Sequence, residues 1–317
     1  MRDLMLGLAV AIREAVARVE ALGGPRLVQG DSSGGDAQFD IDHAAEEATW
    51  NYLRAQSGEP FAVYTEDGDL RETGPNPRRV LIIDPIDGTR PASAGLEMST
   101  VSLASAPYRG EETTIADVDH ALLYEWKSGR WMYSGDRPGI EAPDYPLALP
   151  RLSPNTELDR MFWSIEFNGH PMRLMTDAYA HLVDASANTG GVFVFNSASF
   201  SISRIITGQL DAYVDIGNRL LRDHPRTEAE FRAAGRGHIL HLFPYDIAAS
   251  VRLAEQAGVV ITDSYGKPLG GTRLLDISPH NQQSCIAAAN PLLHERILES
   301  VHWDPPHPRT DDRRAQA

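Results

Sequence analysis

Leu81-Ile82-Ile83-Asp84-Pro85-Ile86-Asp87-Gly88-Thr89 is the stretch that decides the fold of this chain. Its first three residues are aliphatic without polar alternation, which predicts the end of a buried strand. Pro85 lacks a backbone donor and has a fixed φ, so we expect the strand to stop there. Asp84 and Asp87 would then lie on one tight turn, with Gly88 supplying the backbone conformation that the turn needs.

Two carboxylates at one strand end repel each other, and both remain ionised only when a cation lies between them. Carboxylates and a turn carbonyl are hard oxygen ligands of the kind that Mg²⁺ prefers. Thr89 adds a hydroxyl able to orient a water molecule. The alternative is a plain Asp-Pro turn with a capping aspartate, because such turns are common. The stretch therefore indicates a divalent-metal site, and the rest of the chain must decide between this site and a plain turn.

Length and charge set the outer limits. The 317 residues are enough for two domains or for one large layered α/β unit. A formal net charge of −15 argues against a nucleic-acid-binding surface and against binding to an anionic membrane. It does not exclude a phosphorylated substrate, because bound Mg²⁺ reverses the local field. The single cysteine, Cys285, excludes an intrachain disulfide and a thiolate metal cluster, and we expect it to be buried in a strand.

The N-terminal residues predict an amphipathic helix rather than a signal peptide, and no apolar run is long enough to cross a bilayer. We therefore expect a cytoplasmic protein. Hydrophobic spacing predicts helices over residues 3–22, 40–53, 172–182, 198–207, 247–257 and 294–301. Strands are predicted at 61–64, 81–83, 99–105, 115–118, 121–124, 131–133, 161–165, 192–195, 210–215, 259–263 and 284–288.

Three segments are predicted to lie outside this pattern. Residues 25–39 are polar and glycine-rich, which predicts a loop, and the tail from residue 304 is predicted to be disordered. Residues 216–242 form a long connection rich in arginine and histidine, for which a solvated surface insertion is the favoured interpretation. One or two of its arginines could contact a substrate phosphate. His238 and His241 alone are a weak indication of a transition-metal site.

Four acidic points occur in order along the chain: Asp40 with Asp42, Glu66 with Asp67, Asp84 with Asp87, and Asp246. Taken singly, Asp42 and Asp246 would be interpreted as helix N-caps, and Glu66 and Asp67 as solvated turn residues. Together with their spacing, they resemble the inositol monophosphatase family, within the fructose-1,6-bisphosphatase-like superfamily of metal-dependent phosphatases. Asp84-Pro85-Ile86-Asp87-Gly88-Thr89 is similar to the family's central signature. Tyr245-Asp246-Ile247-Ala248-Ala249 and Asn290-Pro291 resemble its later motifs, and the resemblance extends from about residue 4 to about residue 301.

The resemblance implies a layered α-β-α-β-α sandwich, with the active site between two halves. It implies an N-terminal α/β half over residues 1–135 that carries the main metal site, a proline-rich connection over 136–160, and a C-terminal half over 161–303. The implied ligands of two or three Mg²⁺ ions are Glu66, Asp84, the carbonyl of Ile86, Asp87 and Asp246. Glu66 and Thr89 would activate the attacking water, with Asp42 supporting them from behind. The implied substrate-binding residues are Gly88, Thr89, Asn196, Ser197 and Asp215.

The sequence also departs from the family pattern on the substrate side. Arg90-Pro91-Ala92 stands where the family has a residue followed by Asn-Phe. Asp67 replaces the second residue of a Glu-Glu pair, and Gln29-Gly30-Asp31 stands where a lysine is usual. Phe193-Val194-Phe195-Asn196-Ser197 replaces Arg-x-x-Gly-Ser, and Asp215 stands for a substrate-contacting glutamate. The chemistry is therefore expected to be kept, while the substrate need not be an inositol phosphate.

We accordingly predict a Mg²⁺-dependent phosphatase that hydrolyses a small inositol, sugar or nucleotide phosphate with metal-activated water, without a covalent phosphoenzyme. Fructose-1,6-bisphosphatase or 3'-phosphoadenosine 5'-phosphate phosphatase activity is the alternative within this class. A non-catalytic relative that binds a metal or phosphometabolite is the alternative from another class, and Arg90-Pro91-Ala92 is its best support. The family resemblance also suggests a homodimer.

Overall fold

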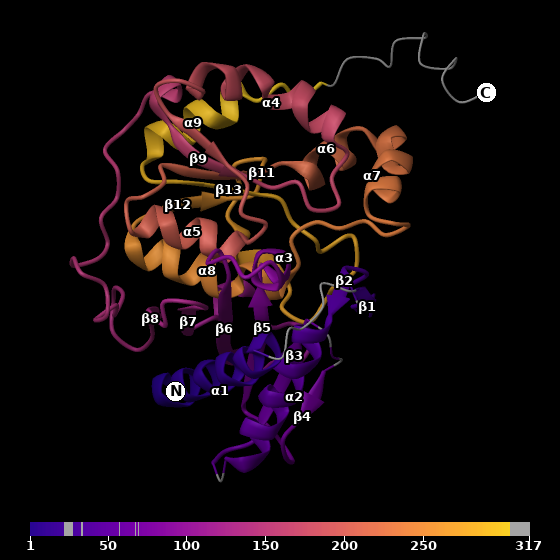
Figure 1. The fold of residues 1–317 in the computed structure, drawn as a ribbon, viewed down its shortest axis with the longest axis vertical. Helices are drawn as coiled ribbons and strands as arrows, with labels where there is room; N and C mark the ends of the chain where they lie inside the picture. Colours follow the sequence, from indigo (N-terminus) through magenta and orange to yellow (C-terminus); the bar gives the residue numbers. More distant parts are fainter. Residues whose placement is uncertain (22–27, 33, 57, 67, 69, 305–317) are drawn as a thin grey trace.

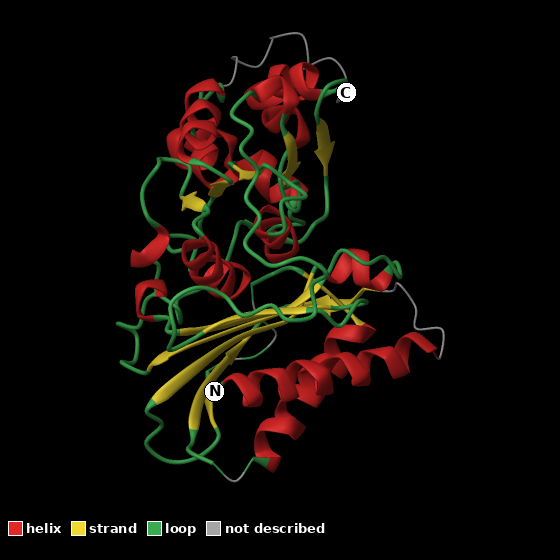
Figure 2. Ribbon diagram, turned by 90° about the vertical axis from the view of Figure 1, so that its left-hand side faces the viewer, coloured by secondary structure: helices red, strands yellow, loops and turns green. Residues whose placement is uncertain are grey.

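The protein's structure is a computed structural model that describes residues 1–21, 28–32, 34–56, 58–66, 68 and 70–304. Helices and sheets alternate in layers (Figure 1, Figure 2). The layers are, in order, α1 (Arg2–Ala21) with α2 (Asp40–Ala55), a six-stranded sheet, α5 (Ala198–Ile206) with α8 (Pro244–Ala257), a five-stranded sheet, and α4 (Met172–Ser186) with α9 (Pro291–Ser300). This is the predicted α-β-α-β-α sandwich, and the prediction of the fold class is confirmed.

The six-stranded sheet takes its strands from the first half of the chain. They are β3 (Phe61–Thr65), β4 (Arg71–Glu72), β5 (Arg79–Asp87), β6 (Thr100–Pro107), β7 (His120–Glu125) and β8 (Trp131–Ser134). The spatial order is β4-β3-β5-β6-β7-β8, with β3 parallel to β5 and the other neighbours antiparallel. Every residue of β5 from Val80 to Asp87 is buried, because helices cover both faces of the sheet.

The five-stranded sheet takes its strands from the second half. They are β9 (Phe162–Ile165), β10 (Gly191–Phe193), β11 (Ala212–Asp215), β12 (Val260–Thr262) and β13 (Cys285–Ala288). The order is β10-β9-β11-β13-β12, in which β9 is parallel to both of its neighbours. Cys285 is buried in β13, as expected. The proline-rich residues 136–157 lead from β8 to η2 (Leu158–Arg160) along the side of the molecule (Figure 1).

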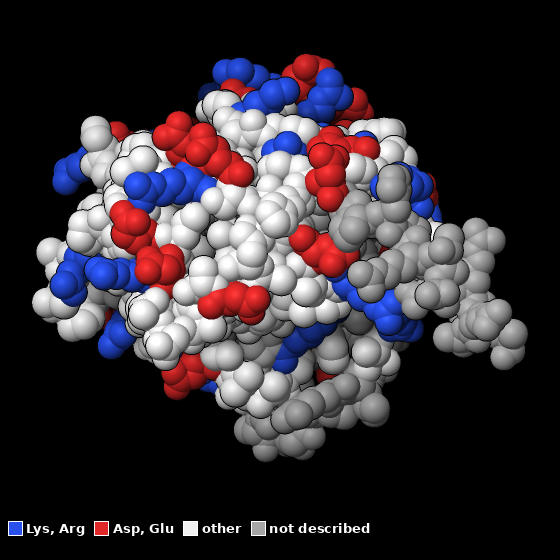
Figure 3. Space-filling model, turned by 90° about the horizontal axis from the view of Figure 1, so that it is seen from above, with Lys and Arg blue, Asp and Glu red and all other residues white. Residues whose placement is uncertain are grey.

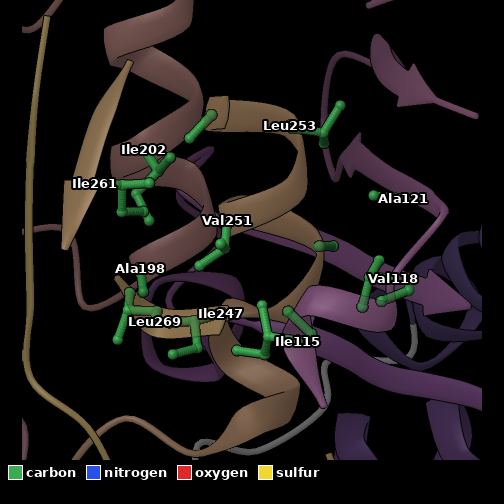
Figure 4. Packing of buried hydrophobic residues seen from close by; sticks show 14 of the residues in the cluster. Ile115, Val118, Ala121, Ala198, Ile202, Ile247, Val251, Leu253, Ile261 and Leu269 are labelled. Atoms are coloured by element: carbon green, nitrogen blue, oxygen red, sulfur yellow. The ribbon is translucent and has the colours of Figure 1, made fainter. Parts of the chain in front are cut away.

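The core between the two sheets is built on α5 and α8. Ile247, Val251 and Leu253 of α8 are all fully buried and point to different sides of the helix (Figure 4). A helix that buries apolar side chains on several sides is typical of one enclosed between two layers. Each such side chain contributes roughly 1.5–3 kcal/mol when it leaves water. The two sheets are therefore held together by helices that belong to the second half of the chain.

The outer helices are amphipathic instead. Met5, Leu8, Ile12 and Val16 of α1 recur at helical spacing and are buried in one cluster with the six-stranded sheet. A third cluster joins α4 and α9 to the five-stranded sheet. Since these helices bury only one face, their other faces remain polar.

Two local predictions are wrong. Residues 25–39 were expected to form a loop, but β1 (Val28–Asp31) and β2 (Ala37–Phe39) pair as an antiparallel hairpin. Its residues lack an alternating apolar pattern, so the sequence carries no strand signal. Residues 25–27 and 33 of the predicted loop lie outside the described residues. Residues 115–118 were expected to form a strand, but η1 (Ile115–Asp117) is a 3₁₀ helix. The Asp117 carboxylate accepts a hydrogen bond from the Thr114 amide at 2.9 Å, and such local bonds compete with strand pairing.

The expectation for residues 216–242 is correct only in part. The segment contains α6 (Gly217–Asp223), η3 (Pro225–Thr227) and α7 (Glu228–Ala234), and Arg232 is exposed and paired with Glu228. His241, however, is only 6% exposed, so the end of the segment belongs to the interior. The remaining 3₁₀ turn is η4 (Leu269–Gly271).

Surface features add little to the assignment of function. No helix among the described residues is both long and apolar enough to cross a membrane. Acidic and basic side chains are intermixed over the face seen from above in Figure 3. The tail that was expected to be disordered lies, from residue 305 onward, outside the described residues.

Candidate active site

The site begins at the end of β5, where the chain leads into the short helix α3 (Thr89–Ser93) (Figure 1). The strand was expected to stop at Pro85, but it does not. It continues to Asp87, and its pairing with β6 shifts register between Asp84 and Asp87. The proline is accommodated because a bulge leaves one residue unpaired. The irregularity places two carboxylates close together at one end of the sheet.

Gly88 turns the chain from β5 into α3. Its φ is +92°, a conformation that favours glycine, as the sequence predicts. A Cβ at this position would lie 2.9 Å from the Met98 carbonyl oxygen and 2.9 Å from Ser197 Cβ. Gly88 therefore permits both the turn and the close approach of the second half of the chain.

A pocket with about 630 Å³ of empty space, its open mouth included, lies at this point between the two halves. Ten of the eleven predicted site residues line it: Glu66, Asp84, Ile86, Asp87, Gly88, Thr89, Asn196, Ser197, Asp215 and Asp246. Parallel strands explain part of this convergence. Glu66 follows β3, whose last residue Thr65 pairs with Ile83 of β5, so Glu66 comes beside Asp84.

Three aspartates of the pocket are buried together. Burial, and then the nearby Asp87 and Asp246 carboxylates, raise the pKa of Asp84 well above its ordinary value. Burial also raises the pKa of Asp87, and burial and Asp87 raise that of Asp246. These directions mean that the protein without a cation opposes full ionisation of the three side chains.

Backbone and hydroxyl groups orient each of these aspartates. The Ile86 amide donates to Asp84 Oδ1 at 3.0 Å, and the Phe243 amide donates to Asp246 Oδ2 at 2.6 Å. The Ser199 amide and the Ser197 hydroxyl donate to Asp87 Oδ2 at 2.6 and 2.9 Å. Each carboxylate thus has one oxygen held by the protein, an arrangement typical of metal-ligating carboxylates.

This donor set fits a hard divalent cation, because it consists of oxygen atoms and contains buried carboxylates that repel one another. The described side chains are not, however, arranged as in a formed metal site. As the side chains stand, no three His, Cys, Asp or Glu residues of the described chain are arranged to hold a metal ion. The fit therefore rests on donor chemistry and burial, and the predicted ligands Glu66, Asp84, Ile86, Asp87 and Asp246 remain predictions.

Thr89 and Ile86 are linked to each other. The Thr89 hydroxyl donates to the Ile86 carbonyl oxygen at 3.1 Å. With its proton used in this way, the hydroxyl oxygen presents lone pairs that can accept a hydrogen bond from a water molecule. This geometry suits the predicted role of Thr89.

Asp42 is the predicted residue that does not line the pocket. It is buried near the start of α2, and its Oδ2 accepts a hydrogen bond from the Phe39 amide at 2.7 Å. Asp246 has the same relation to Phe243 at the start of α8. Neither aspartate is an N-cap in the strict sense, since each lies inside its helix. Asp67, which accompanies Glu66 in the sequence, lies outside the described residues.

Other pocket residues were not predicted. Asp36 from the β1–β2 hairpin pairs with Arg90, with Nη2 and Oδ1 2.7 Å apart, and accepts from Asn168 Nδ2 at 2.9 Å. Glu166 follows β9, a pattern of a buried strand ending in an acid that could have been noticed in the sequence. Asp36 gave no such signal, because it lies in a polar loop.

Two histidines form the far wall. His170 Nε2 lies 3.2 Å from His241 Nδ1, and both residues line the pocket. Burial lowers the pKa of both imidazoles. The described arginines of residues 216–242 do not line the pocket, so the predicted contact of one of them with a phosphate has no support.

Comparisons with known proteins agree on one relationship. The sequence model of the inositol monophosphatase family matches residues 4–303. A fructose-1,6-bisphosphatase/inositol-1-monophosphatase of Methanothermobacter thermautotrophicus is 23% identical over 266 residues, which cover 82% of each chain. A protein of the same description from Thermococcus kodakarensis is 22% identical over 280 residues, or 87% of each chain.

Solved structures share the fold. A Pyrococcus horikoshii protein described as similar to inositol-1 monophosphatase has a TM-score of 0.64 at 20% identity, covering 95% of this chain and 98% of its own. An IMPase of Thermotoga maritima has a TM-score of 0.64 at 19% identity, covering 95% and 96%. At this level of identity the structural likeness supports the fold alone.

Proposed function

Because this chain belongs to the inositol monophosphatase family, and is therefore a phosphomonoester hydrolase, we propose that it is a Mg²⁺-dependent phosphatase acting by direct attack of water. The observation that carries this proposal is the group of buried aspartates in one pocket, Asp84, Asp87 and Asp246, each of which has a pKa raised above its ordinary value. A protein would not keep three such carboxylates in one pocket without a counter-ion. The non-catalytic alternative is correspondingly disfavoured.

The proposed roles follow from position and hydrogen bonding. Bound Mg²⁺ would lower the pKa of water and neutralise charge on the transferring phosphoryl group. Asp84, Asp87 and Asp246 would hold the ions, with Glu66 and the Ile86 carbonyl completing the ligands. Thr89 would orient the water through its hydroxyl oxygen, and Glu66 would accept its proton. Asp42 does not line the pocket, and from the start of α2 it would support the residues that do.

The phosphate would lie against the turn between β5 and α3. Gly88 is the N-cap of α3 and Thr89 is its first residue, and the first amides of a helix have no partner within it. Ser197 lies close to Gly88, and Asn196 also lines the pocket; both come from the other half of the chain, which makes them candidates for substrate contact. A homodimer and a cytoplasmic location remain predictions from the sequence.

A bisphosphate substrate is the second candidate. It is favoured by the names of the archaeal relatives, which include fructose-1,6-bisphosphatase, and by Arg90 in the pocket wall. Against it, Arg90 is already neutralised by Asp36, so a second phosphate would have to displace that carboxylate. Adenosine 3',5'-bisphosphate meets the same obstacle.

The deciding experiment measures phosphate release from inositol 1-phosphate, fructose 1,6-bisphosphate, glucose 6-phosphate and adenosine 3',5'-bisphosphate, with Mg²⁺ and with EDTA. We expect release to require Mg²⁺ and to fall by about a hundredfold or more in Asp84→Asn, the range that follows from losing several kcal/mol of transition-state stabilisation. Asp177→Asn, on the exposed face of α4, is the matched control and should keep full activity. Near-wild-type release by Asp84→Asn, or undiminished release in EDTA, would refute the proposed site.

A further inference from the structure

The charges that line the pocket do not balance. Among the described residues, seven carboxylates line it, and Arg90 is the one Lys or Arg beside them. Arg90 is paired with Asp36. Two divalent cations would balance Glu66, Asp84, Asp87 and Asp246. Glu166 and Asp215 are then left without a counter-charge, before the phosphate of the substrate adds its own negative charge.

These two carboxylates are neighbours for a structural reason. β9 and β11 are parallel, and Ile165 pairs with Val214, so the residues that follow lie side by side at the same edge of the sheet. The Glu166 amide donates to the Val214 carbonyl oxygen at 3.3 Å, and the Asp215 carboxylate contributes to raising the pKa of Glu166. The pair is the counterpart, in the second sheet, of Glu66 and Asp84 in the first.

Each of the two side chains has one oxygen engaged. Glu166 Oε1 accepts from the Phe167 and Asn168 amides at 2.8 and 2.9 Å and from Asn196 Nδ2 at 3.2 Å. Asp215 Oδ1 accepts from the Gly217 amide at 3.1 Å. These bonds hold the carboxylates in place and leave Oε2 and Oδ2 available to a ligand. Glu166 is 7% and Asp215 is 1% exposed, so both are built into the wall rather than solvated.

The neighbouring imidazoles add another acceptor. His170 Nδ1 lies 3.4 Å from the Glu166 carbonyl oxygen, so in the neutral ring this nitrogen carries the proton. His170 Nε2 then accepts from His241 Nδ1, which leaves a lone pair on His241 Nε2. That atom is buried and has no hydrogen-bond partner in the described chain. His241 lines this pocket and also a second cavity beside Arg222. A ligand that donates a hydrogen bond would satisfy the orphaned acceptor.

We propose that the wall formed by Glu166, Asp215 and His241 binds a protonated amine, and that the preferred substrate is the phosphomonoester of an amino alcohol. The inference deepens the proposed phosphatase function and rests on it. An ammonium group offers hydrogen-bond donors and a positive charge, and so satisfies the acceptors and balances the charge. A neutral polyol would satisfy the acceptors but supply no positive charge, so Glu166 and Asp215 would have to be protonated or stay unpaired.

The test compares compounds that differ only in an amine and a hydroxyl. Aminoethyl, aminopropyl and aminobutyl phosphate are assayed against the corresponding hydroxyalkyl phosphates, so that chain length is sampled as well. We expect kcat/KM to favour the best amine over its hydroxyl partner about 10- to 100-fold, the range of one hydrogen bond with a charged group. Equal values throughout the series would overturn the inference.

Variants identify the residues responsible. Glu166→Gln keeps the side-chain shape and one oxygen acceptor, and should reduce the ratio of amine to hydroxyl kcat/KM by about tenfold or more. Asp215→Asn is the second variant, in case the first does not fold. Glu295→Gln, exposed on α9, is the matched control and should leave the ratio unchanged. A ratio that survives in both Glu166→Gln and Asp215→Asn would contradict the assignment.

A binding measurement separates this inference from the proposed function. Calorimetry with Mg²⁺ present compares aminopropylphosphonate with hydroxypropylphosphonate, neither of which can be hydrolysed. Tighter binding of the amine without phosphate release from any compound would retain the amine site and refute the phosphatase. Phosphate release with equal binding of the two phosphonates would retain the phosphatase and refute the amine site.

Discussion

At the scale of single residues, the site depends on carboxylates whose two oxygens have different tasks. Asp84, Asp87, Asp215 and Asp246 each use one oxygen to accept a backbone hydrogen bond. That bond fixes the rotamer before any ligand arrives, so binding orders little that is not already ordered. This arrangement destabilises the folded state, because burial disfavours the charged form of all four carboxylates.

The pH dependence of folding stability can measure this destabilisation at Asp215. Burial raises its pKa from 3.8 to about 7, so the folded protein holds this proton more tightly than the unfolded chain does. The stability of wild type relative to Asp215→Asn should therefore fall as pH rises from about 4 to about 7 and then level off. The total change is at most about 4 kcal/mol, from 1.36 kcal/mol for each unit of pKa.

Urea denaturation of both proteins, in EDTA and at several pH values across that window, checks this prediction. Asp177→Asn serves as the control, since its carboxylate is exposed on α4. A stability difference between wild type and Asp215→Asn that does not vary with pH would show that Asp215 is not protonated in the folded protein.

At the scale of elements, the junction of β5 with α3 is the most constrained point. Gly88→Ala should lower both stability and activity, because the new Cβ meets the Met98 carbonyl oxygen and Ser197. We expect a loss of stability of roughly 1–3 kcal/mol, the range for backbone strain at one residue, with an added steric term. The rate of phosphate release should fall by more than the loss of folded protein accounts for, because Ser197 also orients Asp87.

Gly95→Ala is the matched control for this prediction. Gly95 has a similar φ of +77°, but a Cβ there would meet no atom within 4 Å. Both variants therefore carry the conformational strain, and only Gly88→Ala carries the close contact. Comparable losses of activity in the two variants would mean that close packing at Gly88 does not shape the site.

At the scale of the whole molecule, the two halves share one core. Ile202 of α5 and Ile247 and Val251 of α8 are buried in the same cluster as Val80 and Ile82 of β5. Arg204 of α5 also forms a buried ion pair with Glu125 of β7. The division into halves at residues 136–160 thus remains a prediction about chain order, and it does not imply that either half folds alone.

We accordingly expect residues 1–135, produced alone, to show no cooperative unfolding transition in circular dichroism. One face of its sheet would lose the cover of α5 and α8 and expose apolar side chains to water. Co-expression with residues 136–317 should restore a folded complex, and that complex is the control. A cooperative transition for residues 1–135 alone would show that the inner face of the sheet does not need these helices.

The sequence by itself determined most of the helices and strands, because their signals are local. The ten predicted residues that line the pocket were given by the resemblance to the inositol monophosphatase family, with local signals supporting only some of them. Aliphatic runs ending in an acid mark Glu66 and Asp84, and helical spacing marks α1 and α8. Glu166 was not predicted as a site residue, although it carries the same local pattern. Its meaning depends on β9 lying parallel to β11, which brings Glu166 beside Asp215.

Only the tertiary structure decided which side chains share the pocket. Asp36 and Arg90 are 54 positions apart and pair because the β1–β2 hairpin reaches α3. His170 and His241 are 71 positions apart and meet because β9 and the segment before α8 end at the same wall. Spacing along the chain cannot encode such contacts, since they depend on how the layers pack and on the direction in which each strand ends.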